Sequence, residues 1–239
     1  MTNPERDHKY WAVVPAAGSG QRMGADVPKQ YLQLGGQTVL EHALDALLAC
    51  TRITGIVVVV APNDERWPAI MTRYRDQRIE TATGGAERCH SVLNGLQQLG
   101  ARAHDEDWVL VHDAARPCLR TTDIDVLIEA LHDDTQGGLL GVPVADTLKQ
   151  VDGAGRITAT VERTGIWRAL TPQMFRSGQL RAALQQVLAN NRVVTDEAAA
   201  MELAGYHPRM VEGQGDNIKI TLPADLALAN FYLHLRSQS

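Results

Sequence analysis

The sequence has few cysteines, no long apolar run and no excess of basic residues. Its 239 residues include only Cys50, Cys89 and Cys118, with no C-x-x-C spacing, which suits a reducing cytoplasm and argues against a zinc site. No apolar run approaches the roughly 20 residues of a membrane span, and the first nine residues lack the apolar core of a signal peptide. The net charge of -5 argues against non-specific nucleic-acid binding. We therefore expect a cytoplasmic protein that binds neither membranes nor nucleic acid.

Several common catalytic motifs are also missing. There is no G-x-S-x-G elbow of a serine hydrolase and no His pair with a Glu at zinc-ligand spacing. The Gly-Lys-Ser/Thr ending of a Walker A loop is absent as well. Glycines at positions 18, 20 and 24 are one residue too far apart at the end for the dinucleotide fingerprint G-x-G-x-x-G.

What is present is a glycine loop after an apolar stretch. Val13 and Val14 are typical of a buried strand end, and small residues follow them. Because such residues let a ligand lie directly on the backbone, the N–H groups of the loop can bind an anion. The loop and the cations that follow it contain Pro15, Ala16, Ala17, Gly18, Gly20, Arg22 and Lys29. The segment predicts a triphosphate site, with a polar surface loop as the alternative.

Strand and helix patterns alternate along the chain. A β-branched run at residues 56–60 is typical of a parallel strand buried on both faces. The alternation predicts an α/β fold with a doubly wound, mostly parallel sheet, in which ligands bind at the carboxyl ends of the strands. The predicted strands are residues 10–15, 53–61, 79–83, 108–112 and 139–144, with a short one within 216–221. The predicted helices are residues 39–50, 63–74 (capped by Asn63), 87–99, 121–132 (capped by Thr122 or Asp123), 177–189, 195–204 and 223–235.

The alternation stops between about residues 145 and 170. Residues 152–155, DGAG, are typical of a hairpin turn, and alternating polar and apolar residues flank them at 144–151 and 156–163. A hairpin of this length is only marginally stable alone. We expect a β-arm at about 144–166 that packs on a second copy of the chain, in an otherwise single domain of residues 1–239.

Two further loops carry polar side chains at predicted strand ends. Gly84 and Gly85 precede a helix that brings Arg88 and Ser91, a combination that favours a nucleoside pocket over a plain loop. Asp113 follows the central strand 108–112. A carboxylate there suits Mg²⁺, which binds one or two carboxylates plus phosphate oxygens.

Alternatives remain for several of these side chains. Asp113 could instead pair with Arg116 and brace its loop, and His112 is interpreted as structural. Thr195 is expected to cap a helix in which Asp196 and Glu197 have ordinary structural roles. In the predicted strand near the C-terminus, Asn217 and Lys219 alternate with Ile218 and Ile220, so both polar groups should face one side.

Taken together, the sequence blocks resemble one family, the 2-C-methyl-D-erythritol 4-phosphate cytidylyltransferases, over residues 10–235. The blocks are PAAGSGQRMG, PKQY, GGAERCHSVLNGL, VHDAARP, DTLK, RTGIW with LTPQ, TDEA and DNIKIT. The resemblance implies a Rossmann-like nucleotidyltransferase fold that uses CTP and methylerythritol phosphate with Mg²⁺. It also implies a homodimer formed through the β-arm.

The resemblance also implies residue roles. Arg22, Lys29 and Lys219 would be catalytic, and Asp113 would lie by the metal and the sugar hydroxyls. CTP would be bound by Pro15, Ala16, Ala17, Gly18, Gly20, Gly84, Gly85, Arg88, Ser91 and Ala114. The acceptor would be bound by Asp113, Arg116, Thr147, Arg163, Thr171 and Thr195, with Thr147 and Arg163 reaching the partner's site. One departure is Ala86, where some members carry an acidic residue, so backbone groups must replace that nucleoside contact.

Two other functions remain open at this stage. A ribitol 5-phosphate cytidylyltransferase would keep the chemistry and change the acceptor. A nucleotide-binding regulator without turnover would be expected to lack Arg22, Lys29 or Asp113, and all three are present.

Overall fold

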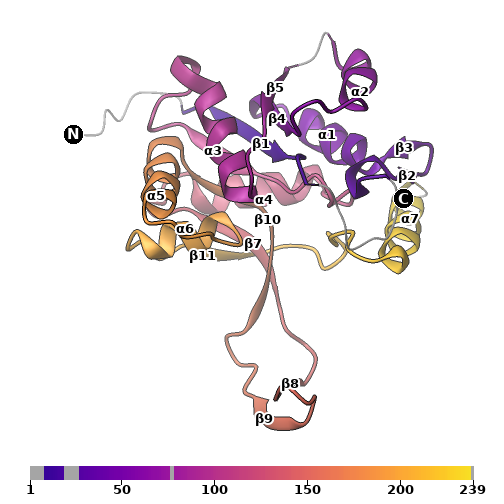
Figure 1. Cartoon of the computed structure of the whole chain (residues 1–239), viewed down its shortest axis with the longest axis vertical. Coiled ribbons are helices and arrows are strands. Elements are labelled where there is room, and N and C mark those ends of the chain that lie inside the picture. Colours follow the sequence, from indigo (N-terminus) through magenta and orange to yellow (C-terminus); the bar gives the residue numbers. More distant parts are fainter. Residues whose placement is uncertain (1–7, 19–26, 76–77, 238–239) are drawn as a thin grey trace.

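A computed structural model describes residues 8–18, 27–75 and 78–237. Within these residues, seven strands form one sheet in the order β11-β7-β10-β6-β1-β4-β5, with a protruding hairpin, β8-β9 (Figure 1). The sheet strands are β1 Tyr10–Pro15, β4 Ile53–Val60, β5 Ile79–Thr83, β6 Trp108–Val111, β7 Gly138–Pro143, β10 Trp167–Arg176 and β11 Arg209–Glu212. The helices are α1 Val39–Ala49, α2 Trp67–Arg73, α3 Arg88–Leu99, α4 Thr121–Leu131, α5 Ser177–Ala189, α6 Glu197–Leu203 and α7 Pro223–Ser237. Short elements are η2 Lys29–Tyr31, β2 Gln33–Leu34, β3 Gln37–Thr38 and η3 Gly100–Arg102.

The sheet is mostly parallel, as predicted. β1 lies between β4 and β6 and is parallel to both, while β10 runs antiparallel between β6 and β7. The chain therefore leaves β1 toward β4 and β5 and returns on the other side to β6. This reversal beside β1 is the point where open α/β sheets form a crevice for ligands.

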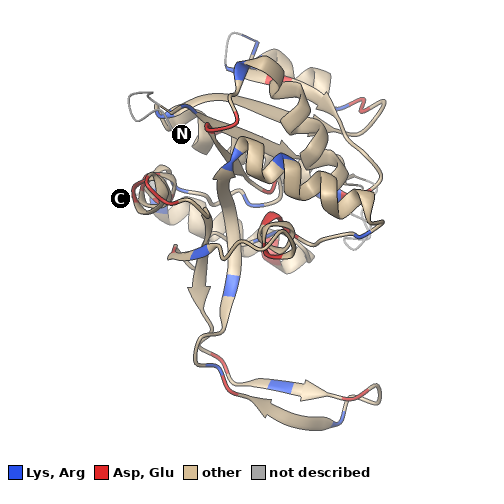
Figure 2. Cartoon of the chain, turned by 90° about the vertical axis from the view of Figure 1, so that its left-hand side faces the viewer, with Lys and Arg blue, Asp and Glu red and all other residues tan. Residues whose placement is uncertain are grey.

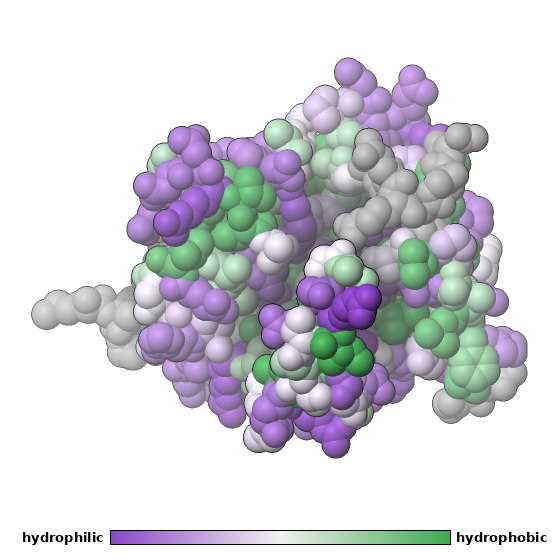
Figure 3. All heavy atoms as spheres, turned by 60° about the horizontal axis from the view of Figure 1, so that its bottom comes forward, coloured by the Kyte–Doolittle hydropathy of each residue, from purple (hydrophilic) through white to green (hydrophobic). Residues whose placement is uncertain are grey.

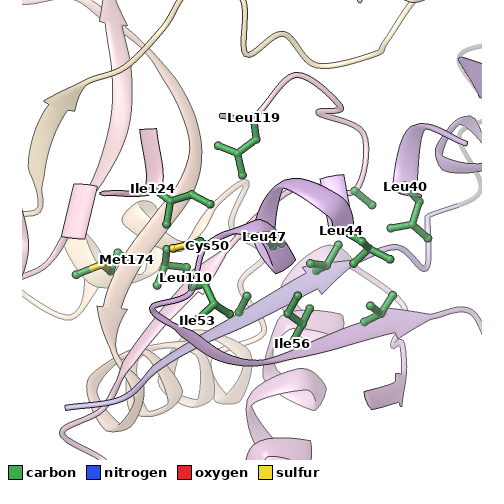
Figure 4. Close-up of a cluster of buried hydrophobic side chains, with 14 of the residues drawn as sticks. Leu40, Leu44, Leu47, Cys50, Ile53, Ile56, Leu110, Leu119, Ile124 and Met174 are labelled. Carbon is green, nitrogen blue, oxygen red and sulfur yellow. The ribbon is translucent and has the colours of Figure 1, made fainter. Parts of the chain in front are cut away.

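Successive residues of a strand point to opposite faces of the sheet. Both faces of this sheet carry apolar side chains, and helices cover both. Val14, Val58 and Leu110 point to one face of the sheet. They pack there with residues of α1 and α4, in the core that Figure 4 shows. Val13, Val59 and Val111 pack against the other, with α3, α5 and α6. Every residue of β6 is buried, as expected for a central strand between two helical layers.

Most element predictions are confirmed, with corrections at helix starts. The second helix is shorter than predicted: Asn63 lies outside it with φ of 62°, and Asp64 Oδ1 accepts hydrogen bonds from the N–H groups of Arg66 and Trp67 instead. Helix α4 has Arg120 at its N-cap, so Thr122 and Asp123 lie within the helix and are not caps. Helix α6 is capped by Asp196 rather than by Thr195.

Strand predictions failed in the last third of the chain. The sequence did not predict β10, whose residues include Pro172 and the polar Gln173, or the short β11. The predicted strand within residues 216–221 is wrong, since this segment forms no strand in the described structure. Its alternation has another cause: Ile218 and Ile220 pack in a small core with residues of α7.

The hairpin arm projects from the body, as Figures 1 and 2 show. Its strands, β8 Leu148–Val151 and β9 Ile157–Val161, are antiparallel. The turn is closed by the N–H of Asp152 donating to the carbonyl of Arg156 at 2.9 Å, and Gly155 has φ of 76°, which favours glycine. Apolar side chains lie among polar ones on the arm (Figure 3), and Val151 is 52% and Ile157 65% exposed. The arm thus has almost no core of its own in this chain.

Candidate active site

A cavity of about 400 Å³ lies at the carboxyl ends of β1 and β6. The three loops that the sequence assigned to ligands all contribute to it, which confirms that they share one sheet edge. Its predicted lining residues are Pro15, Ala16, Ala17, Gly18, Lys29, Gly85, Arg88, Ser91, Asp113, Ala114 and Lys219. Ala86, where the resemblance implies backbone contacts to the nucleoside, also lines it, and so do Gln30, Glu87 and Ala115, which were not predicted. Gly20 and Arg22 lie outside the described residues.

The loop after β1 is held by a side chain that the sequence reasoning missed. Gln30 is buried, and its Nε2 donates to the carbonyl of Ala16 at 2.6 Å and to that of Gly18 at 3.0 Å. The N–H of Ala16 donates to the carbonyl of Val59 at 2.7 Å. These bonds hold the backbone of Ala16 and Gly18 in place, and the same short η2 turn brings Lys29 to the cavity.

The loop after β5 needs its first glycine for packing. A Cβ at Gly84 would lie 2.3 Å from the Cβ of Ala17, so the two loops touch only because position 84 has no side chain. The Oγ of Ser91 accepts from the N–H of Gly85 at 3.2 Å and lies 3.3 Å from the carbonyl of Glu87. Ser91 therefore braces this loop as well as lining the cavity.

Asp113 is the centre of a charged network in the cavity. Its Oδ2 lies 2.9 Å from Nζ of Lys219, and its Oδ1 accepts from Nε of Arg88 at 3.1 Å. Nε of Arg116 is 3.6 Å from Oδ2. The two sequence interpretations of Asp113, a ligand at the cleft and a partner of Arg116, therefore both agree with its position.

The charges of this network shift the pKa values of Asp113 and Arg88. Burial alone would raise the pKa of Asp113, but the positive charges of Arg88, Lys219 and Arg116 outweigh burial and hold that pKa well below its usual range. Burial would also lower the pKa of Arg88, and the charges of Glu197 and Asp113 raise it instead. Asp113 is therefore ionised at neutral pH.

His112, predicted to be structural, lies behind Asp113 together with two predicted acceptor residues, Arg116 and Thr171. His112 is buried, and its Nε2 lies 3.1 Å from the carbonyl of Arg116, which can only accept a hydrogen bond. With the ring proton on Nε2, Nδ1 accepts from the hydroxyl of Thr171 at 2.9 Å, and the Thr171 oxygen accepts from the N–H of Asp113. Burial lowers the pKa of His112 to about 4. His112 is thus a neutral structural residue, as the sequence predicts.

Arg116 and Thr171 take part in the same supporting layer. Arg116 donates to the carbonyls of Asn217 at 2.8 Å and Ala169 at 3.4 Å, and the Nδ2 of Asn217 donates to the carbonyl of Thr171 at 2.7 Å. Neither Arg116 nor Thr171 lines the cavity of this chain. Their contact with an acceptor stays a prediction.

Three predicted acceptor residues lie at exposed positions that do not line the cavity. Thr147 and Arg163 belong to the arm, where Arg163 Nη1 donates to the carbonyl of Ala145. Thr195 is exposed just before α6. Single-chain geometry does not bring these side chains to Asp113, so their assigned roles stay predictions.

Glu197 is the functional candidate that sequence reasoning did not predict. It pairs with Arg88 through two contacts, Nη1 to Oε1 at 2.6 Å and Nη2 to Oε2 at 3.0 Å. Burial raises its pKa, and the nearby charge of Arg88 opposes that rise. Its partner is 109 residues away in sequence, so no local pattern could have indicated the pair.

The residues present fit a magnesium ion that arrives with a nucleotide. Among the described residues, no three His, Cys, Asp or Glu side chains are grouped as ligands. Asp113, the buried carboxylate of the cavity wall, could supply the single protein oxygen, and phosphates would supply others. No described helix is long and apolar enough to span a membrane.

The crevice beside β1, with lysines and an ionised carboxylate from three separate segments, places the protein among the α/β nucleotidyltransferases. A family model described as 2-C-methyl-D-erythritol 4-phosphate cytidylyltransferase, IspD, matches residues 10–235. The chain belongs to this family.

Individual relatives agree with the family match. The enzyme of that name from Pseudomonas putida strain GB-1 is 57% identical over 219 residues, covering 91% of this chain and 92% of its own length. A crystal structure of 4-diphosphocytidyl-2C-methyl-D-erythritol synthase aligns with a TM-score of 0.84 at 37% identity, covering 95% of this chain and all of that one. The Francisella tularensis cytidylyltransferase aligns with a TM-score of 0.78 at 36% identity, covering 94% of this chain and 99% of that one.

Proposed function

We propose that this enzyme transfers a cytidylyl group from CTP to 2-C-methyl-D-erythritol 4-phosphate in the cytoplasm. The products would be 4-diphosphocytidyl-2-C-methyl-D-erythritol and pyrophosphate, in non-mevalonate isoprenoid precursor synthesis. The observation that carries the proposal is the family match over residues 10–235, with Lys29, Asp113 and Lys219 lining one cavity.

The charges of the cavity suit this reaction. An oxygen of the acceptor phosphate would attack the α-phosphorus of CTP, forming a new P–O bond as the bond to pyrophosphate breaks. That oxygen is already ionised near neutral pH, so no general base is needed. Lys29 and Lys219 would stabilise the charge that develops on phosphorus and hold two mutually repelling anions together.

The loops after β1 and β5 would bind the nucleotide in the same cavity. The loop from Pro15 to Gly18, with Gly20 and Arg22, would bind the triphosphate, and Gly84, Gly85, Arg88, Ser91 and Ala114 would bind cytidine. Asp113 would hold Mg²⁺, which when bound would neutralise phosphate charge.

The acceptor site is proposed to be completed by a second copy of the chain. Val151 and Ile157 are exposed on an arm that has almost no core within its own chain. In a homodimer formed through the arm, Thr147 and Arg163 would reach the partner's cavity, where Arg116, Thr171 and Thr195 would complete acceptor binding.

Pyrophosphate release tests this function. Purified protein is given CTP and Mg²⁺ with methylerythritol phosphate, with ribitol 5-phosphate, or with no acceptor. We expect release with methylerythritol phosphate only. Release only with ribitol 5-phosphate would identify the pentitol enzyme instead, and CTP binding without release in any mixture would identify a non-catalytic regulator.

A further inference from the structure

Glu197 is a buried carboxylate whose position helix capping does not explain. It is 1% exposed and is the first residue of α6, while the capping bond of that helix comes from Asp196. A buried carboxylate is costly unless it is paired and hydrogen-bonded. The partner here is Arg88, which binds both carboxylate oxygens in a bidentate contact.

Arg88 stands between two acids. Its Nη1 and Nη2 donate to Glu197, and its Nε donates to Oδ1 of Asp113 at 3.1 Å. Its Nη2 also lies 3.0 Å from the same oxygen of Asp113. Since the negative charge of Glu197 balances the positive charge of Arg88, Arg88 adds little net positive charge to the cavity. What the pair does is fix one oxygen of Asp113, while the other oxygen faces Lys219 at 2.9 Å.

We propose that Glu197 is a positioning residue for the transfer reaction, acting through Arg88 on the carboxylate of Asp113. This inference rests on the proposed function. Without the charge of Glu197, Arg88 would be free to take both oxygens of Asp113 and compete there with Lys219 and with ligands. Glu197 thus keeps Arg88 on one oxygen and leaves the other to Lys219, which lines the cavity.

The first test compares two neighbouring carboxylates at the start of α6. Glu197→Gln keeps the shape and removes the charge, and Asp196→Asn is the matched control, since Asp196 contacts Gln173 and Ala199 rather than Arg88. We expect Glu197→Gln to lower kcat/KM for CTP about 10- to 100-fold, the usual cost of losing a residue that orients a ligand-binding group. Asp196→Asn should stay close to wild type. Equal effects in the two variants would overturn the proposal.

The second test asks whether Glu197 acts through Arg88. In an Arg88→Ala background, Glu197→Gln should change kcat/KM little further, although it should raise stability by removing an unpaired buried charge. Independent, multiplying losses would overturn the proposal. Arg88→Lys should not restore activity, because an ammonium group cannot bridge two carboxylates as a planar guanidinium does; full rescue by Lys would show that only the charge matters and would overturn it too.

A crystal structure of ligand-free Glu197→Gln decides the inference without turnover. We expect both oxygens of Asp113 to contact Arg88, whereas Arg88 contacts only Oδ1 in the wild type. An unchanged Arg88–Asp113 contact would overturn the proposal. If Glu197→Gln does not fold, Glu197→Asp takes its place, because the shorter acid keeps the charge but cannot reach Arg88 in the same bidentate contact. Failure of the wild-type protein to release pyrophosphate would concern the proposed function alone.

Discussion

The Nζ of Lys219 lies 2.9 Å from Oδ2 of Asp113, although the two residues are 106 positions apart in sequence. The lysine is thus paired with a carboxylate, and in the proposed reaction it would turn from there to an incoming phosphate. We expect Lys219→Met to lower kcat at least about 100-fold, through loss of one preorganised charge. Steady-state pyrophosphate release measures this effect, and near-normal kcat would contradict the assigned role.

Lys29 should be equally important, because it lines the same cavity beside the loop that Gln30 holds. Lys29→Ala is expected to lower kcat by at least about 100-fold. Lys9→Ala is the matched control, since Lys9 is exposed and does not line the cavity. Near-normal turnover of Lys29→Ala would refute a catalytic role for this residue.

A shared active site predicts complementation between variants. Arg163→Ala and Lys29→Ala chains should each be impaired as homodimers, but a mixed dimer would keep one intact site. Mixing them should therefore restore part of the activity. Subunit exchange is shown separately with differently tagged chains, and no rescue despite exchange would contradict a site shared between chains.

The burial of His112 predicts how the free energy of unfolding depends on pH. Burial lowers its pKa from 6.5 to about 4, so the unfolded chain binds this proton more readily than the folded chain does. Its stabilising contribution is complete above pH 6.5 and is lost as the pH falls toward 4. Between pH 7 and pH 5 the loss should be about 2 kcal/mol.

Urea unfolding at the two pH values measures this loss. His112→Gln should show a smaller fall between pH 7 and pH 5, whatever its stability at pH 7. His207→Gln, at an exposed position, should keep the wild-type fall. Identical pH dependence in wild type and His112→Gln would contradict the assignment.

The close packing of Gly84 on Ala17 predicts that a side chain at position 84 would lower stability. Gly84→Ala would place a Cβ 2.3 Å from that of Ala17, so one loop must move, at a cost of about 1–3 kcal/mol. We expect lower stability and a higher KM for CTP, measured by urea unfolding and by kinetics. Gly153→Ala is the control, because nothing lies within 4 Å of a Cβ there. Equal behaviour of the two variants would show that the loops tolerate displacement.

The sequence predicts the central sheet well because its strands carry strong local signals. Residues 56–60 form a β-branched run, and small or polar residues follow the strands that end at Pro15, Thr83 and Val111. The shared sheet edge follows from parallel topology alone. Local signals are weaker in β10, where Pro172 and Gln173 interrupt the apolar pattern, and that strand was missed.

Other features depend on partners that are distant in sequence. Ile218 and Ile220 alternate like strand residues, yet a contact with α7 produces the alternation. Gln30 and Glu197 become meaningful only when folding brings the glycine loop and Arg88 beside them. Residue type and spacing therefore identified the groups that face the cavity better than the groups that hold them.

The nearly coreless arm has a consequence for how this enzyme responds to dilution. Because Val151 and Ile157 remain exposed within their own chain, we expect the hairpin to depend on contacts from a second copy for much of its order. With arm contacts supplied by a second copy, specific activity would fall as the enzyme is diluted below the dissociation constant of the pair. The output of the reaction would then rise more steeply than in proportion to the amount of enzyme that a cell makes.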